Sequence, residues 1–566
     1  MAEMQSQSEV AVKPRHPYAV AAIWCVAFVA LVPALRAQEA PVPRHTGVPQ
    51  DWSQRNIVFS REGLAEHPDV MNREVRVLHQ AMQRWAVPEF GVFKGVNPLP
   101  LPIPRRKSRI KRDWNVNMGG RLFPNAFPAK FSIDPGAPPD CVNDYAVFGL
   151  AVVGTPGSPV APANLVGFNN LYSGVGPPVG LCGTDPTVLF AYNVTTVTGG
   201  RIRTSPILSL DGKKIAFVES IPANAGLFIP AQAIFHIVTW AHEGTIDAPV
   251  VPSSMISLPY SPSANNSTSS PYIDYGSDTV YVGADSGLVY QITGVFKGTP
   301  TISAGVWPVL LNPGHLTPPV LDSHRGKLMV GGVNGNLYRV DTTTGAVATV
   351  VVGTGFSSGI VAPPIVDVTN GTTFVISADN GTTGAVLADV DTASLTVLST
   401  AQIGQGAFGG STAINLYQPA FDNNYYNDPS TGRIHTCGTG PADITPYHYS
   451  FAFTGRTMQT VDPLPQQLLP STVARCTGWT EFFNPNVAGG TDYFFFGLTQ
   501  ECTGAGTSGC LAEITATNAI PTKAPLTGGP RGIVVDNYST EAQASSLYTT
   551  AGSVNTAYKF TQNGLQ

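Results

Sequence analysis

The chain has 566 residues, of which 12% are charged, and its formal net charge is −5. Glycine and proline together number 107 (58 + 49), which with so few charges favours an all-β protein with short strands and uncharged turns. Residues 1–112 carry 16 Lys and Arg against 9 Asp and Glu, whereas residues 113–566 carry 16 against 28. The acidic main body argues against nucleic acid as a partner.

The first 37 residues have the organisation of a secretory signal peptide. Lys13, Arg15 and His16 precede an uncharged apolar stretch, Tyr18–Leu35, and Ala37 supplies a small residue before the expected cleavage site. The alternative is an uncleaved membrane anchor, because the apolar stretch is long enough for a marginal span. In either case we expect the chain to be exported to the periplasm, the cell surface or the medium. It would meet a membrane only through this segment, if uncleaved.

Six cysteines remain once Cys25 in the signal segment is set aside. An even number in an oxidising compartment predicts disulfides, and sequence neighbours suggest the pairs Cys141–Cys182, Cys437–Cys476 and Cys502–Cys510. Fifteen connectivities are compatible with six cysteines. Because the chain has no Cys-x-x-Cys, neither a zinc site nor a thiol-redox site is indicated.

Residues 38–112 do not have the pattern of the remainder and are interpreted as an N-terminal arm. Apolar residues at helical spacing predict a helix over about 69–85, whose apolar stripe is interpreted as a docking face. Pro98–Pro104 alternates proline with apolar residues and is therefore extended. Six cations follow within residues 105–112. They are interpreted as a solvated linker, the alternatives being a processing site or a patch for an anionic surface.

From residue 113 onward, short apolar runs alternate with Gly/Pro turns, which predicts a single β-propeller of four-stranded blades. Two units at Ser270–Val350 repeat with a period of 48 residues, measured from Asp274 to Asp322, and such periods are typical of propeller blades. We count eight strand clusters, with seven blades as the alternative. The last cluster shows three strands, and a strand near Leu122–Ile133 is predicted to complete it and close the ring.

The units Val280–Ile292 and Leu328–Val340 share the form strand-Gly-x-x-x-Gly-x-hydrophobic-Tyr-x-hydrophobic, and Asp341–Gly345 follows the second as an Asp-Thr-Thr-Thr-Gly corner. This resembles the blades of exported bacterial propellers of the quinoprotein-like (PQQ-like) and YVTN-repeat type, over about Ser270–Leu398. The resemblance implies a propeller fold without specifying an activity. The chain lacks the repeated blade-ending Trp and the adjacent Cys pair of quinoprotein dehydrogenases, so no quinone cofactor is predicted.

No catalytic, cofactor or metal-binding residues are assigned from the sequence, although several motifs invite a test. Gly355–Gly359 matches a nucleophile elbow and Gly404–Gly409 a dinucleotide fingerprint, but neither is followed by the helix it needs, so both are interpreted as loops. His242-Glu243 lacks a second His for a metalloprotease. Between His435 and His448 lie Cys437 and Asp443, and a disulfide with loop histidines is favoured there over a catalytic Cys–His pair.

Aspartates recur at the start of successive units, at Asp274, Asp322, Asp367 and Asp422. Repetition favours a structural role, each carboxylate capping a turn after the innermost strand, over a ring of functional carboxylates. Asp422-Asn423-Asn424 and Asn427-Asp428 cluster oxygen ligands that calcium could use, but their spacing matches no calcium loop, and an Asx-rich turn is favoured.

The sequence thus favours an exported propeller that serves as a binding or structural module at the cell envelope, with a protein or glycan partner. Long loops in Asn415–Pro446 and Phe483–Gly509 are expected to present Tyr and Phe side chains, although strand alternation would pack many of these between blades. The alternatives are an exported propeller enzyme acting on carbohydrate or as a dehydrogenase, and a subunit of a surface assembly. Only six Glu follow residue 113, and no clustered acid/base pair lies outside the turns.

Overall fold

The protein is described by a computed structural model that covers residues 56–59, 110–132, 139–158, 160–176, 179–262, 266–356, 359–408, 414–484, 490–504, 506–515, 522–536, 543 and 545–562. All of these fall within one compact unit, Thr46–Gln566. The predicted signal peptide, the predicted helix at 69–85, Pro98–Pro104 and the basic run as far as Arg109 lie outside the described residues.

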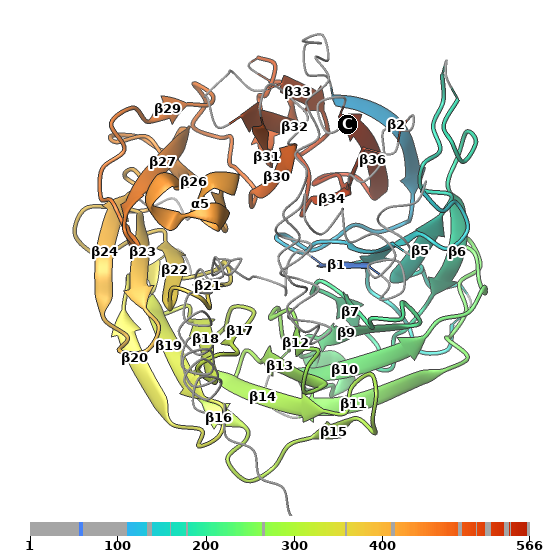
Figure 1. Ribbon diagram of the computed structural model, residues 1–566. Helices are drawn as coiled ribbons and strands as arrows, with labels where there is room; N and C mark the ends of the chain where they lie inside the picture. Colours follow the sequence, from blue (N-terminus) through green and yellow to red (C-terminus); the bar gives the residue numbers. More distant parts are fainter. Residues whose placement is uncertain are drawn as a thin grey trace, which may run out of the picture. The chain divides into compact units, whose positions relative to one another are not determined.

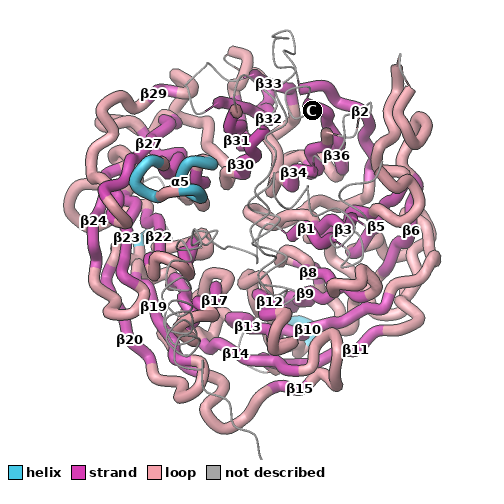
Figure 2. Tube along the Cα trace, viewed as in Figure 1, coloured by secondary structure: helices cyan, strands magenta, loops and turns pink. Residues whose placement is uncertain are grey.

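Eight sheets, in which strands consecutive within a blade pair antiparallel, are arranged in a ring, which confirms the propeller and decides for eight blades (Figure 1). The innermost strands of such a ring border its central channel. Strands dominate, and the helical segments are short (Figure 2). Blade 1 consists of β3 (Ala129–Ser132), β4 (Tyr145–Gly149), β5 (Leu165–Asn169) and β6 (Thr187–Tyr192), and blade 2 of β8 (Ile207–Leu208), β9 (Lys214–Ile221), β10 (Gln232–Thr239) and β11 (Met255–Ser261), with β7 (Arg201–Ile202) also on β9 and η2 (Ala225–Leu227) before β10. Blade 3 consists of β12 (Tyr272–Asp274), β13 (Thr279–Gly283), β14 (Leu288–Thr293) and β15 (Thr301–Ile302), with β16 (Val309–Leu310) also on β14. Blade 4 consists of β17 (Val320–Asp322), β18 (Lys327–Gly331), β19 (Asn336–Asp341) and β20 (Val347–Val351).

The second half of the ring repeats the same antiparallel order from the channel outward. Blade 5 consists of β21 (Ile365–Asp367), β22 (Thr372–Ser377), β23 (Val386–Asp391) and β24 (Val397–Gln402). Blade 6 consists of β25 (Ala420–Phe421), β26 (Arg433–Thr439), β27 (Pro446–Thr454) and β28 (Thr457–Met458), with β29 (Gln466–Gln467) also on β27 and with α5 (Asn423–Asn427) and η4 (Pro429–Thr431) before β26. Blade 7 consists of β30 (Thr480–Asn484), β31 (Thr491–Gln500), β32 (Ser508–Thr515) and β33 (Thr522–Pro525), and blade 8 of β34 (Val534–Asp536), β35 (Ser546–Thr550), β36 (Thr556–Gln562) and β2 (Ile110–Asn117).

The burial pattern of each strand follows from its place in the blade. The second strand, such as β13, is buried at every residue because both of its faces contact neighbouring blades. The outermost strand β20 alternates instead between exposed and half-buried residues, as a half-solvated strand does. This difference explains why the apolar runs in the sequence mark the inner strands more clearly than the outer ones.

The aspartates at the end of successive innermost strands cap turns, as predicted. Asp274 accepts from the backbone N–H of Gly276 at 3.1 Å, and Asp322 accepts from that of Arg325 at 3.1 Å. Asp367 accepts from the N–H groups of Thr369 and Asn370, and Asp422 caps α5 through Tyr425 N. These carboxylates are therefore occupied by backbone donors within their own turns.

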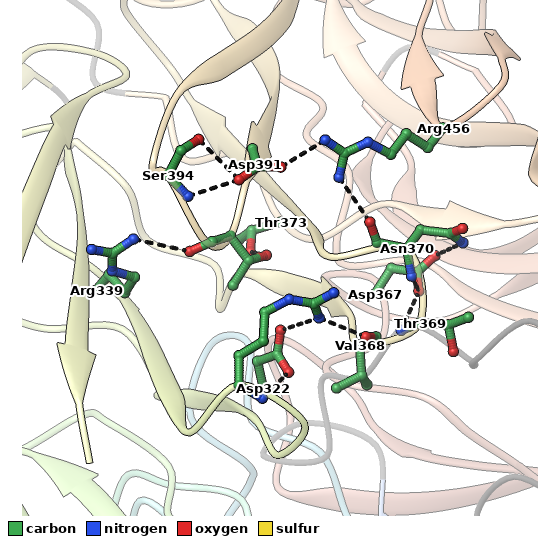
Figure 3. Close-up of polar contacts among 12 residues, drawn as sticks. Asp322, Arg339, Asp367, Val368, Thr369, Asn370, Thr373, Asp391, Ser394 and Arg456 are labelled. Carbon is green, nitrogen blue, oxygen red and sulfur yellow. Dashed lines mark hydrogen bonds and ion pairs between the residues drawn. The ribbon is translucent and has the colours of Figure 1, made fainter. Parts of the chain in front are cut away.

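Arginine side chains tie these turns to neighbouring blades, around blade 5 in particular (Figure 3). Arg325 of blade 4 donates to its own Asp322 at 2.8 Å and to the carbonyl of Val368 in blade 5 at 2.7 Å. From the other side, Arg456 of blade 6 donates to the Asn370 carbonyl at 2.9 Å and to Asp391 at 2.7 Å. Blade 5 is thus clamped by both of its neighbours.

Ring closure joins β2, which precedes blade 1 in the chain, to the last strand of the chain within blade 8. Strand β2 pairs antiparallel with β36 from Ile110↔Gln562 to Asn117↔Thr556. A buried ion pair reinforces the ladder, since Lys559 Nζ lies 2.8 Å from Asp113 Oδ2 and both side chains are fully buried. Closure by an N-terminal strand was correctly predicted, but its location at Leu122–Ile133 was wrong. The apolar residues there contribute β3 to blade 1 instead, while β2 escaped notice because its sequence, IKRDWNVN, is mostly polar.

A fragment of the predicted arm, β1 (Asn56–Phe59), extends blade 1 on its channel side. It pairs in parallel with β3, from Asn56↔Ala129 to Phe59↔Ser132, and contacts β8 and β34 of the flanking blades. Blade 1 therefore has five strands, and its innermost strand is supplied by a segment far upstream of the remainder.

All three predicted disulfides are present. Cys141–Cys182 joins two loops of blade 1, and Cys502–Cys510 crosses the β31–β32 connection of blade 7. Cys437–Cys476 links β26 of blade 6 to the segment that enters blade 7. Three disulfides are consistent with an extracellular or otherwise oxidising compartment.

The closing ion pair yields a direct test of ring closure. Asp113→Ala should destabilise the protein by about 3–5 kcal/mol, because it leaves the buried ammonium of Lys559 without its carboxylate. Replacing both partners, as Asp113→Leu with Lys559→Met, should restore most of that loss. The measurement is urea denaturation followed by tryptophan fluorescence. Equal stability of the Asp113→Ala variant and the wild type would show that the pair contributes nothing to closure.

A second prediction concerns pH. Burial raises the pKa of Asp389, at the interface of blades 5 and 6, to about 7. One carboxylate oxygen accepts from Met458 N at 2.9 Å and the other has no partner. Because the folded state holds this proton more tightly than the unfolded chain does, stability contributed by the protonated group is lost as pH rises from about 4 to about 7. Asp389→Asn removes the titration.

The free energy of unfolding of Asp389→Asn, measured relative to that of the wild type, should therefore increase by roughly 2–3 kcal/mol between pH 5 and pH 8. Urea midpoints of both proteins at the two pH values measure this difference. A difference that stays constant with pH would contradict the raised pKa. Asp391→Asn provides the contrast, because hydrogen bonds from Ser394 and Arg456 hold the pKa of Asp391 low, at about 2 despite partial burial.

Candidate functional site

The segments that lead into the innermost strands surround one end of the channel, which we call the entry mouth. Three adjoining cavities, of about 420, 320 and 290 Å³, lie there and share Pro124 in their walls. Volumes of this size are typical of sites for small ligands. The capping aspartates follow the innermost strands and so belong to the opposite end, the exit turns.

Five arginines line the entry mouth. The largest of the three cavities is walled by Arg121 from the β2–β3 connection, by Arg201 of β7 and Arg203 just after it, and by Arg531 from the approach to β34. Arg475, which precedes β30, lines the second cavity together with Arg531. Blades 1, 2, 7 and 8 thus each direct at least one guanidinium group toward this end of the channel.

No carboxylate balances most of this charge. No Asp or Glu is found among the described residues that line the three cavities. Within the described part of the chain, none of the five arginines lies within ion-pair distance of a carboxylate. Of the five, Arg203 alone is connected to a described carboxylate, through the side-chain amide of Asn266. When the amide nitrogen of Asn266 donates to Asp285, its amide oxygen accepts from the Arg203 guanidinium at 3.2 Å.

The guanidinium groups are partly desolvated and repel one another. Burial lowers the pKa of Arg531, and the nearby positive charge of Arg121 lowers it further. Burial also lowers the pKa of Arg203; the negative charge of Asp285 opposes this decrease, and the positive charge of Arg201 increases it. Arg203 and Arg531 nevertheless remain protonated near neutral pH, because a guanidinium group does not lose its proton in proteins. The Nε atoms of Arg201 and Arg531 are buried without a hydrogen-bond partner, an arrangement that is costly unless a ligand supplies acceptors.

A histidine–carboxylate pair borders the third cavity. His315 Nδ1 lies 2.7 Å from Asp285 Oδ1, and the His315 side chain is 57% exposed. The hydrogen bond to Asp285 raises the pKa of His315. Aromatic and apolar groups complete the mouth: the Arg203 guanidinium lies over the Phe123 ring at 4.3 Å, and Tyr417 and Ile360 line the same cavity. Acidification therefore adds a further positive charge to the mouth.

Neither the five arginines nor the His315–Asp285 pair was identified as a site from the sequence. Aspartates at the exit turns recur with the blade period, which made them conspicuous, whereas the arginines precede their strands by differing numbers of residues and lie in only some blades. One available signal was scarcity: only 16 cations are spread over residues 113–566, and several fall just before a predicted innermost strand. Their convergence required the ring geometry.

The histidines near Cys437 do not form a catalytic pair. Cys437 is bonded to Cys476, so it offers no thiol. His435 and His448 lie on β26 and β27 rather than in loops as expected, and their rings stack with Nδ1 of one 3.0 Å from Nε2 of the other. Burial lowers the pKa of His448 to about 3 and that of His435 well below its usual value. Both are therefore neutral packing groups near pH 7.

The remaining motifs add no site among the described residues. In Gly355–Gly359 the two serines lie outside the description, as does Gly409 of the other glycine motif. Asp422 and Asp428 act as caps of α5 and η4, in agreement with the favoured Asx-rich turn. No group of three His, Cys, Asp or Glu suited to a metal occurs in the described ranges. In the same residues, no helix has the length and apolarity needed to cross a membrane.

The expected aromatic loops are largely regular structure. Asn415–Pro446 contains β25, α5, η4 and β26, and most of Phe483–Gly509 that is described belongs to β30, β31 and β32. Phe421 and Tyr425 pack against each other and against Phe453 in the core, so the alternative of packing between blades is confirmed for Phe421 and Tyr425. Tyr417 is the aromatic of that group that lines the mouth. The error arose because Asn, Asp and Gly around these strands suggested loops.

No protein-family model and no curated protein matches the chain. Among solved structures, Saccharomyces cerevisiae Sqt1 is similar with a TM-score of 0.48 and 9% identity, over 80% of this chain and 99% of that one. The Dos1 propeller is similar with a TM-score of 0.45 and 10% identity, over 80% and 95% of the two chains. The assignment as a propeller rests on the eight sheets themselves, and the quinoprotein-like and YVTN resemblance stays a prediction.

Proposed function

We propose that this protein is an exported binding module of the cell envelope, and that the entry mouth is its ligand face. The observation that carries the proposal is the set of five arginines directed at one end of the channel, none of which has a carboxylate partner among the described residues. A fold selected only for stability gains nothing by placing half-buried guanidinium groups beside one another, because their repulsion and partial desolvation both oppose folding. Their retention is explained if a ligand neutralises them.

Export is supported by the predicted signal peptide and is compatible with the three disulfides. The closed ring supplies the rigidity that a binding face needs, because each mouth segment is fixed by the innermost strand that it enters. A partner at the envelope, protein or glycan, would then approach along the channel axis. It would meet the arginines before any of the capped carboxylates.

An enzyme is the second candidate, and the His315–Asp285 pair favours it. A histidine held by a carboxylate is a common general base. However, Thr317, which lines the same cavity, is engaged: its hydroxyl donates to Pro318 O at 3.2 Å and accepts from Gly331 N at 2.9 Å. Binding is preferred because the arginines concentrate in the cavity that does not include His315.

Obstruction of the mouth tests the ligand face. Asn415 is exposed and lines two of the three cavities, so Asn415→Trp should fill them without a change of charge. We expect a purified envelope glycan or protein that is retained by the immobilised wild-type chain to be lost on this variant. The matched control is Ser323→Trp, at an exit turn between β17 and β18.

Retention that is equal on Asn415→Trp and wild type would exclude the mouth as the ligand face. Loss on both tryptophan variants would indicate that the exit end is involved as well. Cell fractionation with mass determination of the mature N-terminus tests export separately, and the expected mature chain begins after Ala37.

A further inference from the structure

The largest cavity of the mouth, which is lined by Arg121, Arg201, Arg203 and Arg531, has the composition of an oxyanion site. We infer that it binds a small ligand, or the terminal group of a longer one, that carries two or more carboxylate or phosphate groups. This inference rests on the proposed function, because it names the ligand chemistry of the same face. Four guanidinium groups offer far more donors than one monovalent anion can use.

The hydrogen bonds within the cavity leave these donors available. Arg121 and Arg201 make no side-chain hydrogen bond in the described structure, and Arg531 donates only to the Gly552 carbonyl, at 2.9 Å. Guanidinium groups bind carboxylate and phosphate through paired parallel N–H donors, which a lysine cannot reproduce. The arrangement therefore favours planar or tetrahedral oxyanions over a diffuse negative surface.

The walls indicate a ligand of limited size. Between the arginines stand Gly119, Gly120 and Leu122, and Asn555 closes the rim by donating to the Gly119 carbonyl at 3.1 Å. A methyl group at Gly120 would contact Leu150 and Val152 at 3.0–3.1 Å, so the backbone lies close against the apolar wall there. A cavity of about 420 Å³ accommodates a compact polyanion or one end unit of a chain.

The electrostatic potential of the protein favours the binding of anions in this cavity over binding elsewhere on its surface. The body of the protein, residues 113–566, is acidic, so anions are repelled from most of its surface. The cluster of cations, which no described carboxylate neutralises within the cavity, focuses the opposite potential in this partly desolvated recess. Affinity should therefore fall steeply with added salt.

Isothermal titration calorimetry on the mature full chain tests the inference, with citrate as the polycarboxylate probe and pyrophosphate as the phosphate probe. At low ionic strength we expect saturable binding of at least one probe. Arg121→Gln and Arg201→Gln should each weaken it by about tenfold or more, since each removes a charge-assisted contact. Arg201→Lys should restore only part of the affinity, because it keeps the charge and loses the paired donors.

The matched control is Arg112→Gln, an exposed arginine on β2 that is not part of the mouth, which should bind like the wild type. Thermal melts of the free proteins verify folding, and neither mouth variant should melt earlier than the wild type because neither loses a side-chain hydrogen bond. Binding of citrate alone would assign carboxylate chemistry, and binding of pyrophosphate alone would assign phosphate chemistry.

Two results would overturn the inference: no saturable heat with either probe, or equal affinity in the wild type and both glutamine variants. Its failure is distinguishable from that of the proposed function. If neither probe binds while Asn415→Trp still abolishes envelope retention, only the ligand chemistry is wrong. If a probe binds through these arginines while retention is insensitive to Asn415→Trp, the anion site is real and the ligand face of the module lies elsewhere.

Discussion

The structure depends on one backbone ladder, the pairing of β2 with β36, because without it the ring has two open edges. Every other blade is built from a contiguous stretch of chain, apart from the added β1, and could in principle form locally. Blade 8 alone requires strands whose buried contact, Lys559 with Asp113, spans 446 residues. The positions of the mouth residues follow from closure, since Arg121 lies just beyond β2 and Arg531 just before β34.

The two ends of the channel use charge in opposite ways. At the exit turns, carboxylates accept backbone hydrogen bonds and arginines link adjacent blades, so these charged groups stabilise the fold. At the entry mouth, guanidinium groups face cavities that no described Asp or Glu lines. Charged groups that fold stability does not explain are expected at functional sites. The asymmetry is the reason to locate function at one end of the channel.

The sequence was informative wherever a feature repeats or is local. The period from Asp274 to Asp322, the turn-capping aspartates and the neighbouring cysteine pairs were all read correctly, because each depends on residues close in the chain. Failures arose where tertiary context decides. The polar strand β2 is stabilised by its partner rather than by its own residues, and β26 was obscured by the Asn and Asp before it. The arginine cavity could not be foreseen, because Arg121 and Arg531 are neighbours only in a closed ring.

Strand β36, the partner of β2, is the last strand to be synthesised, which leaves β2 without its partner during biogenesis. During vectorial synthesis β2 emerges among the first elements of the ring, and its sheet edge must wait unpaired until the last strand appears. An unprotected edge invites pairing with other chains. Lys111 and Arg112 are exposed on this strand, and such charges discourage illegitimate partners at an edge. The end of the basic run would thereby act as a gatekeeper for the nascent chain.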